Sequence, residues 1–270
     1  MTERHHRALR QTFDEAAERY DRIRPHYLPE VFVDIERLGG LARGSRVLEI
    51  GCGTGQATAD LALRGYEVAA LELGSELAAL ARANLARFPN VEVIVADFEH
   101  WAPPLELFDG VVSATAFHWI DPGVRVVKAA DSLRPGGALA IIDTDHVAGG
   151  TERFFIEVQD CYERADPETQ QGLRLPAAAD LTPDLDELKR SGRFGPIAVR
   201  QYEWERSYST AEYVELLGTY SGHIALEPSV HARLLDCIAI LIDNRYGGRV
   251  DKRYLTTLRV GRRLDEPEVG

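Results

Sequence analysis

An apolar run that passes into a glycine-dense turn constrains this chain more than any other segment. Residues 47–50 are typical of a buried strand. Gly51, Gly53 and Gly55 follow at alternate positions, and glycine tolerates positive φ and leaves no Cβ between the backbone and a ligand. The helix expected next would point its unpaired N–H groups at the same ligand. The segment therefore predicts a strand–loop–helix unit that holds a nucleotide-like ligand.

The position after the last glycine narrows the kind of ligand. A dinucleotide loop of the form G-x-G-x-x-G requires its third glycine at position 56, where this chain has Gln56. The pattern is instead E-x-G-x-G-x-G, with Glu49 two residues ahead of the first glycine. A nicotinamide-dependent oxidoreductase is therefore a less favoured alternative.

Short apolar segments alternate with helical ones from Arg46 to Asp143. The apolar runs predict buried strands, and the segments between them have helix-like spacing. Strands that alternate with helices build a parallel, doubly wound sheet through right-handed crossovers. The expected strands are 46–50, 67–72, 91–96, 109–113 and 138–142, and the expected helices are 55–64, 75–88 and 122–133.

The pattern changes after Asp143. Two further strands are expected at 197–204 and 253–260, with helices at 210–218 and 228–246. We therefore predict a single α/β domain over residues 1–270, built on a doubly wound, mostly parallel, seven-stranded sheet. Its expected parts are an N-terminal helical cap (1–40), a cofactor-binding core (45–143), a helical insertion after the fifth strand (144–194) and a C-terminal completion of the sheet (195–262).

The charge balance argues against some partners. The chain has 31 basic and 43 acidic residues and a formal net charge of −12, whereas nucleic-acid binding needs clustered Lys and Arg. No apolar run approaches the roughly 20 residues of a membrane span, and the first residues are charged rather than apolar. We therefore expect no nucleic-acid partner, no membrane partner and a cytoplasmic location. The sequence does not indicate the oligomeric state.

The three cysteines, Cys52, Cys161 and Cys237, have no C-x-x-C spacing. An odd number of cysteines without such spacing indicates neither a disulfide framework nor a zinc site. Cys52 lies in the glycine loop and is most simply a small packing residue. We expect no bound metal and no disulfide.

Two acids follow successive predicted strands. Glu72 ends the second strand, and in a doubly wound sheet an acid at this place accepts hydrogen bonds from ribose hydroxyls. Asp97 follows the third strand, where a carboxylate can accept from the amino group of an adenine. Phe98 adds an apolar face and a backbone N–H. The structural alternatives are a solvent-facing acid for Glu72 and an Asp turn or N-cap for Asp97.

These segments form an ordered set of motifs. The set comprises Glu49-Ile50-Gly51-Cys52-Gly53-Thr54-Gly55, Glu72, Ala96-Asp97-Phe98, Phe108-Asp109 and Leu133-Arg134-Pro135-Gly136-Gly137. It resembles the motif set of the class I S-adenosylmethionine-dependent methyltransferases. Tyr20-Asp21, Arg24-Pro25-x-Tyr27 and Ala116-Phe117-His118-Trp119 are similar to a bacterial small-molecule subgroup related to trans-aconitate methyltransferase. The resemblance covers about residues 10–143, is weaker over 197–260 and is absent over 144–194.

The resemblance implies a Rossmann-like fold, with S-adenosylmethionine as the cofactor and S-adenosylhomocysteine as its product. The loop from Glu49 to Gly55 would approach the amino-acid and sugar portions of the donor. Glu72 would hold the ribose, and Asp97 with Phe98 would hold the adenine. The other cofactor-binding residues implied are Tyr20, Arg24, Leu73, Ser113 and Phe117.

Some of these side chains also have a chemical rationale of their own. Arg24 can bind the donor carboxylate in a bidentate manner, with Tyr20 close to it, although an exposed amphipathic helix explains the same spacing. Aromatic rings after the fourth strand suit a sulfonium cation. His118 in that segment is the candidate catalytic base, or else a packed histidine that caps the following helix.

The expected reaction is methyl transfer to a small-molecule acceptor, with a carboxylate or hydroxyl oxygen favoured. The chain has no Asn/Asp-Pro-Pro-aromatic run for amino-group methylation and no Pro-Cys nucleophile. With the acidic balance, these absences argue against a nucleic-acid or protein substrate. A non-catalytic protein that binds S-adenosylmethionine or S-adenosylhomocysteine is the other alternative.

Overall fold

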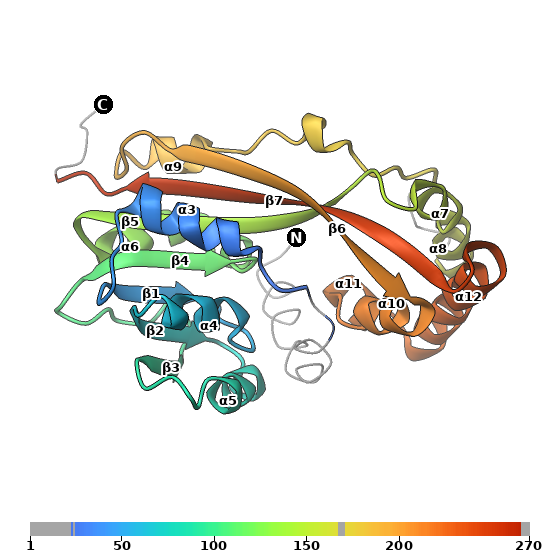
Figure 1. Ribbon diagram of the computed structural model, residues 1–270, viewed down its shortest axis with the longest axis horizontal. Helices are drawn as coiled ribbons and strands as arrows, with labels where there is room; N and C mark the ends of the chain where they lie inside the picture. Colours follow the sequence, from blue (N-terminus) through green and yellow to red (C-terminus); the bar gives the residue numbers. More distant parts are fainter. Residues whose placement is uncertain (1–22, 24, 167–170, 266–270) are drawn as a thin grey trace.

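The computed structural model describes residues 23, 25–166 and 171–265. Its centre is a seven-stranded sheet in the order β3-β2-β1-β4-β5-β7-β6, with helices against it (Figure 1). The predicted α/β fold is confirmed. The strands are β1 (Arg46–Ile50), β2 (Glu67–Glu72), β3 (Val91–Val95), β4 (Phe108–Ala114), β5 (Leu133–Val147), β6 (Ala198–Ser209) and β7 (Arg249–Arg262).

Helices cover both faces of the parallel half of the sheet. The strands β1 to β5 pair in parallel, and β1 is buried along almost its whole length, as expected for a strand packed on both sides. Val47 joins one hydrophobic cluster, whereas its neighbour Leu48 joins another on the opposite face. The first cluster includes residues of α3 (Pro29–Gly39), α4 (Gln56–Leu63) and α5 (Ser75–Asn84), and the second includes α6 (Arg125–Ser132).

The strands β5, β7 and β6 extend beyond the parallel half (Figure 1). β4 ends opposite Ile142, but β5 continues to Val147 and pairs with β7, which runs antiparallel to both β5 and β6. Residues 144–147 were expected to begin the helical insertion, and this expectation is wrong. Residues 143–146 are too polar to show a strand pattern, and their pairing with residues 254–257 of β7 holds them extended.

A third hydrophobic cluster lies at the far end of this extension (Figure 1). It joins Ile23 and the ends of β6 and β7 to several helices. α10 and α12 match the expected ranges, whereas the insertion has only short helices and an irregular stretch. The helices are α7 (Glu152–Glu157), α8 (Gln159–Ala165), α9 (Asp186–Arg190), α10 (Thr210–Leu217), α11 (Ser221–Ile224) and α12 (Pro228–Tyr246).

The described residues show no candidate membrane span and no candidate metal cluster. None of their helices combines the length and the apolar character needed to cross a membrane. No group of three or more His, Cys, Asp or Glu side chains within the described part of the chain is arranged to hold a metal ion.

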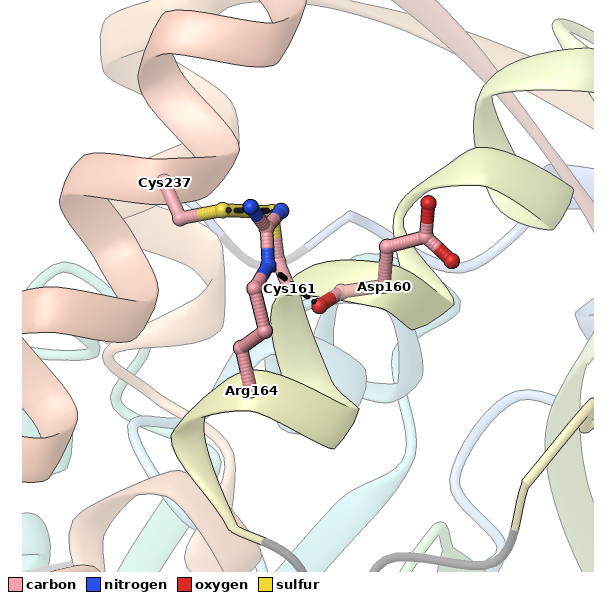
Figure 2. The surroundings of a disulfide bond; sticks show 4 residues. All are labelled: Asp160, Cys161, Arg164 and Cys237. Atoms are coloured by element: carbon pink, nitrogen blue, oxygen red, sulfur yellow. Dashed lines mark hydrogen bonds between the residues drawn. A yellow bond between two sulfur atoms is a disulfide. The ribbon is translucent and has the colours of Figure 1, made fainter.

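A disulfide links two helices of the third cluster. Figure 2 shows Cys161 of α8 bonded to Cys237 of α12, with the Arg164 guanidinium beside both sulfur atoms. The expectation of no disulfide is therefore wrong. The two cysteines are 76 residues apart in the sequence, and only the packing of α8 against α12 brings them together. No local spacing could have indicated the pair.

The disulfide predicts a redox-dependent stability. A cross-link across a long loop restricts the unfolded chain, so reduction should lower the free energy of unfolding by about 2–5 kcal/mol. Denaturant unfolding with and without a reductant measures the effect, and the Cys161→Ser/Cys237→Ser variant is the control that the reductant should leave unchanged. Identical midpoints for the wild type in both conditions would contradict the pairing.

Candidate functional site

A central cavity of about 370 Å³ lies where the strands β1 to β4 end. Ligands of doubly wound sheets bind at this carboxyl edge. The cavity combines apolar walls with the acids and glycines expected from the sequence. Its lining includes Gly51, Gly53, Glu72, Leu73, Asp97, Phe98, Thr115, Ala116, His118, Trp119 and Tyr220.

The glycine loop has the backbone conformation that its sequence predicts. Gly51, Gly53 and Gly55 all have positive φ values, of +72°, +58° and +90°. A Cβ at Gly51 would lie 2.5 Å from that of Ala116, and one at Gly55 would lie 2.7 Å from Leu85. A Cβ at Gly53 would meet nothing within 4 Å. Gly53 therefore presents bare backbone to the open cavity, while the other two allow close packing of the protein itself.

Glu72 is held at the end of β2 by two backbone N–H groups. Its Oε2 accepts a hydrogen bond from Gly53 (2.8 Å), and its Oε1 accepts one from Gly74 (2.9 Å). The side chain is 8% exposed and lines the cavity. Each carboxylate oxygen has further lone pairs, so a fixed acceptor for a pair of hydroxyl groups faces the cavity.

Asp97 and Phe98 lie at the end of β3. Asp97 accepts hydrogen bonds from the Glu99 backbone N–H (3.0 Å) and from the exposed His100 ring (3.1 Å), so the Asp turn considered as the alternative is present. Asp97 also lines the cavity. The Phe98 backbone N–H has no hydrogen-bond partner among the described residues. A hydrogen-bond donor, the Phe98 N–H, and a hydrogen-bond acceptor, the Asp97 carboxylate, therefore lie next to each other at the cavity wall.

The sequence did not single out Thr115, which follows β4. Its φ of +54° is the only positive value among the described non-glycine residues, and such a conformation is unusual for a β-branched residue and typical of functional sites. Its N–H donates to the Ile142 carbonyl (2.7 Å), and its hydroxyl contacts that of Tyr27 (3.1 Å). Thr115 lines the central cavity and two neighbouring cavities.

The other residues predicted for the site lie at the cavity rim, in the core or outside the described part of the chain. His118 is exposed at the rim of the central cavity. The buried Ser113 donates its hydroxyl to the Ile50 carbonyl (3.0 Å). Tyr20 and Arg24 lie outside the described residues. Four predicted positions are not part of the cavity lining, and their contribution to the site stays a prediction: Glu49, Gly55, Ser113 and Phe117.

Glu49 is a buried acid directly behind the glycine loop. It is 1% exposed, and its Oε2 has no hydrogen-bond partner among the described residues. Burial raises the pKa of this carboxyl to about 7, and the negative charge of Glu72 acts in the same direction. Glu49 thus holds its proton to a much higher pH in the folded protein than in the unfolded chain.

A side cavity of about 290 Å³ adjoins the central one. Thr115 and Tyr220 line both cavities. The side cavity is built mainly on one face of the extended strands β5, β7 and β6. Its lining is Pro25, His26, Tyr27, Gln56, Thr115, Thr144, His146, Trp204, Tyr220, Lys252, Tyr254 and Thr256.

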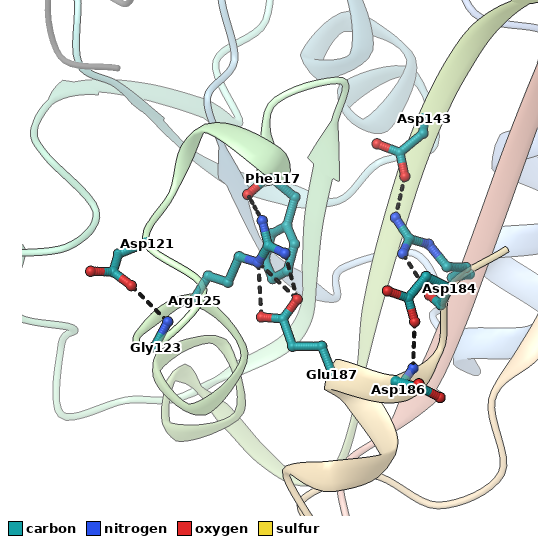
Figure 3. A network of polar contacts seen from close by, with 9 residues as sticks. Phe117, Asp121, Gly123, Arg125, Asp143, Asp184, Asp186 and Glu187 are labelled. Carbon is teal, nitrogen blue, oxygen red and sulfur yellow. Dashed lines mark hydrogen bonds and ion pairs between the residues drawn. The ribbon is translucent and has the colours of Figure 1, made fainter. Parts of the chain in front are cut away.

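A third cavity, bordered by Thr115 and His118, has a polar wall. Figure 3 shows Arg125 bound to the Glu187 carboxylate and to the Phe117 carbonyl. The guanidinium of Arg259 pairs with Asp143 in the same cavity. Carboxylates therefore neutralise both cations of this cavity. The arrangement fixes the short α9 against the end of the sheet.

The buried Glu49 predicts a pH-dependent stability. Because the unfolded chain releases this proton near pH 4.5 and the folded protein near pH 7, its ionisation lowers wild-type stability as the pH rises between these values. Glu49→Gln should therefore be more stable than the wild type by about 1–3 kcal/mol at pH 8 and nearly equal to it at pH 4.5. Glu203→Gln, at an exposed position of β6, is the control for denaturant unfolding. A Glu49→Gln gain that does not change with pH would contradict the assignment.

Comparison with known proteins points to a methyltransferase domain. A family model described as a methyltransferase domain matches residues 47–137. A methyltransferase of Mycobacterium tuberculosis, itself uncharacterized, is 28% identical over 86% of this chain and 85% of its own length. Trans-aconitate 2-methyltransferase of Deinococcus radiodurans is 35% identical over 36% of this chain and 37% of its own. This match confirms the expected resemblance over part of the chain.

Two further comparisons extend over most of the chain. The malonyl-[acyl-carrier protein] O-methyltransferase of Halalkalibacterium halodurans is 25% identical over 74% of this chain and 76% of its own length. The structure of phosphoethanolamine N-methyltransferase 2 of Haemonchus contortus, solved with S-adenosylhomocysteine, has a TM-score of 0.54 at 18% identity. It covers 93% of this chain and 58% of that one, and at this identity it shows the shared fold alone. With the sheet order and the glycine loop, these findings support a class I S-adenosylmethionine-dependent methyltransferase.

Proposed function

We propose that this methyltransferase transfers the methyl group of S-adenosylmethionine to an oxygen of a small-molecule acceptor. The observation that carries the proposal is the Glu72 carboxylate, which two backbone N–H groups fix at the wall of the central cavity. Bare backbone at Gly53 lies beside it. This pair fits a ribose whose hydroxyls donate to an acid while its ring passes close to the main chain.

The remaining donor contacts follow from the cavity wall. Asp97 can accept from the adenine amino group, and the unpartnered Phe98 N–H can donate to a ring nitrogen beside it. Leu73 adds an apolar contact. Arg24 and Tyr20 remain proposed partners of the amino-acid end of the donor. A hydrogen-bond donor on the buried Phe98 and an acceptor on the half-buried Asp97, side by side, favour one heterocycle over others.

Bound S-adenosylmethionine supplies an activated methyl group on a sulfonium leaving group. The protein mainly has to align the acceptor oxygen with that methyl, and such alignment contributes roughly 7–11 kcal/mol. Thr115 and His118 lie at the cavity wall after β4, where an acceptor oxygen would approach. A carboxylate acceptor needs no base, whereas a hydroxyl would need His118 to accept its proton.

Two relatives support an oxygen acceptor. The Halalkalibacterium protein is named as an O-methyltransferase of malonyl-[acyl-carrier protein], and the Deinococcus protein as a methyltransferase of trans-aconitate. Both names describe acceptors that carry carboxyl groups. We propose a small molecule of that general kind in the cytoplasm, with neither nucleic acid nor membrane as a partner.

The donor assignment predicts a loss of affinity in Glu72→Gln. The variant removes the negative charge and replaces one acceptor oxygen with a donor, so S-adenosylhomocysteine should bind about tenfold to hundredfold more weakly. Isothermal titration calorimetry measures the change. Glu67→Gln, at the exposed start of the same strand, is the matched control and should bind as the wild type does. Equal affinities in all three proteins would refute the ribose contact.

Turnover separates an enzyme from a protein that only binds the donor. We expect S-adenosylhomocysteine to form when the wild type meets S-adenosylmethionine and a panel of small carboxylic and hydroxy acids. The Glu72→Gln variant should form it more slowly at low donor concentration. Tight donor binding with no product from any acid or alcohol would favour the non-catalytic alternative.

A further inference from the structure

Lys252 is a buried cation in the side cavity. It is 3% exposed, and its Nζ donates to the Tyr220 hydroxyl (2.7 Å). The same Nζ lies 4.9 Å from the centre of the Tyr220 ring and 5.1 Å from that of Tyr254. No carboxylate of the described residues forms an ion pair with it. A buried charge without a counter-charge is costly, so this position requires an explanation.

The other cationic groups next to the acceptor region are neutralised. In the third cavity Arg125 is paired with Glu187 (Figure 3), and Arg259 is paired with Asp143. Lys252 therefore differs from both arginines, because no carboxylate in the described part of the chain pairs with it. An anionic ligand is the natural counter-charge for a lysine placed in this way.

The sheet places a second polar group beside Lys252. Alternate residues of a strand share a face, so Lys252, Tyr254 and Thr256 of β7 lie in a row, and His146 of β5 is the cross-strand partner of Tyr254. The His146 Nε2 is buried and has no hydrogen-bond partner among the described residues. Burial lowers the pKa of His146 to about 2, with the Lys252 charge acting in the same direction. The ring is thus neutral and able to share one hydrogen bond with a ligand.

An aromatic wall completes the side cavity. Trp204 stacks on Tyr254 with ring centres 4.4 Å apart and an interplanar angle of 19°. Its Nε1 donates to the Thr256 hydroxyl (2.9 Å), which fixes the indole against the sheet. A rigid aromatic surface next to a cation suits a ligand that joins a planar apolar body to an acidic group.

We propose that the side cavity is an acceptor subsite in which Lys252 binds a carboxylate group of the methyl acceptor. The oxygen that receives the methyl group lies elsewhere in the acceptor. The planar body of the acceptor would lie along Trp204 and Tyr254. Its reacting oxygen would enter the central cavity past Thr115 and Tyr220, which line both cavities. The inference rests on the proposed methyl transfer and makes its acceptor an organic acid with two separate polar ends.

The amino-acid end of the donor is the rival occupant. It also carries a carboxylate, and Gln56 of the α4 N-terminus lines the side cavity. The two occupants predict different effects when the charge of Lys252 is removed. Loss of the charge should weaken donor binding if the donor occupies the cavity, and acceptor binding alone if the acceptor does.

The test uses benzoate and benzamide, which share a ring and a shape but differ in charge. Each is titrated by ligand-observed NMR into protein saturated with S-adenosylhomocysteine. We expect the wild type to bind benzoate at least about tenfold more tightly than benzamide. Lys252→Met should lose this preference, and Lys252→Arg should keep it. Lys189→Met, at an exposed position of α9, is the matched control for loss of a lysine charge.

The outcomes separate this inference from the proposed function. Unchanged S-adenosylhomocysteine affinity in Lys252→Met, together with loss of the benzoate preference, supports the subsite and shows that the variant is folded. A wild type without the preference, or a preference that persists in Lys252→Met, overturns it. Weaker S-adenosylhomocysteine binding in Lys252→Met also overturns it, in favour of the donor. A wild type that fails to bind S-adenosylhomocysteine would instead refute the proposed function itself.

Discussion

The hydrogen bonds that hold Glu72 between two loops determine the rest of the donor site. By accepting from the N–H groups of Gly53 and Gly74, one carboxylate connects the turn after β1 to the turn after β2. The main chain at Gly53 has positive φ, and the space that a side chain would fill there stays open. The acid is thus fixed before any ligand arrives, so little side-chain entropy is lost on binding.

The acceptor side depends on a different constraint, the reversed strand β7. Because β7 runs antiparallel to β5 and β6, the three strands continue past the edge where the parallel strands end. The extension carries Lys252 and His146 on one face, and Thr115 connects that face to the donor loop. In the arrangement that we propose, the parallel half of the sheet positions the donor, and the antiparallel half shapes the space for an acceptor.

The sequence predicted several residues that line the central cavity, because the signals for them are local. A strand, a glycine turn and an acid at the next strand end lie close together in the chain and need only the sheet to bring them together. The acceptor side had no such signal. Lys252 lies before the expected strand 253–260, and its burial depends on Tyr220 from a distant segment. The left-handed Thr115 and the bond between Cys161 and Cys237 likewise arise from tertiary packing.

We propose that Glu72 recognises the sugar of the methyl donor in the cavity at the ends of β1 to β4. A crystal structure of the protein with S-adenosylhomocysteine tests this directly. We expect both ribose hydroxyls within hydrogen-bond distance of the Glu72 carboxylate, with the sulfur atom facing Thr115. A nucleoside bound elsewhere, or a Glu72 side chain that turns away from the sugar, would contradict the proposed recognition of the ribose by Glu72.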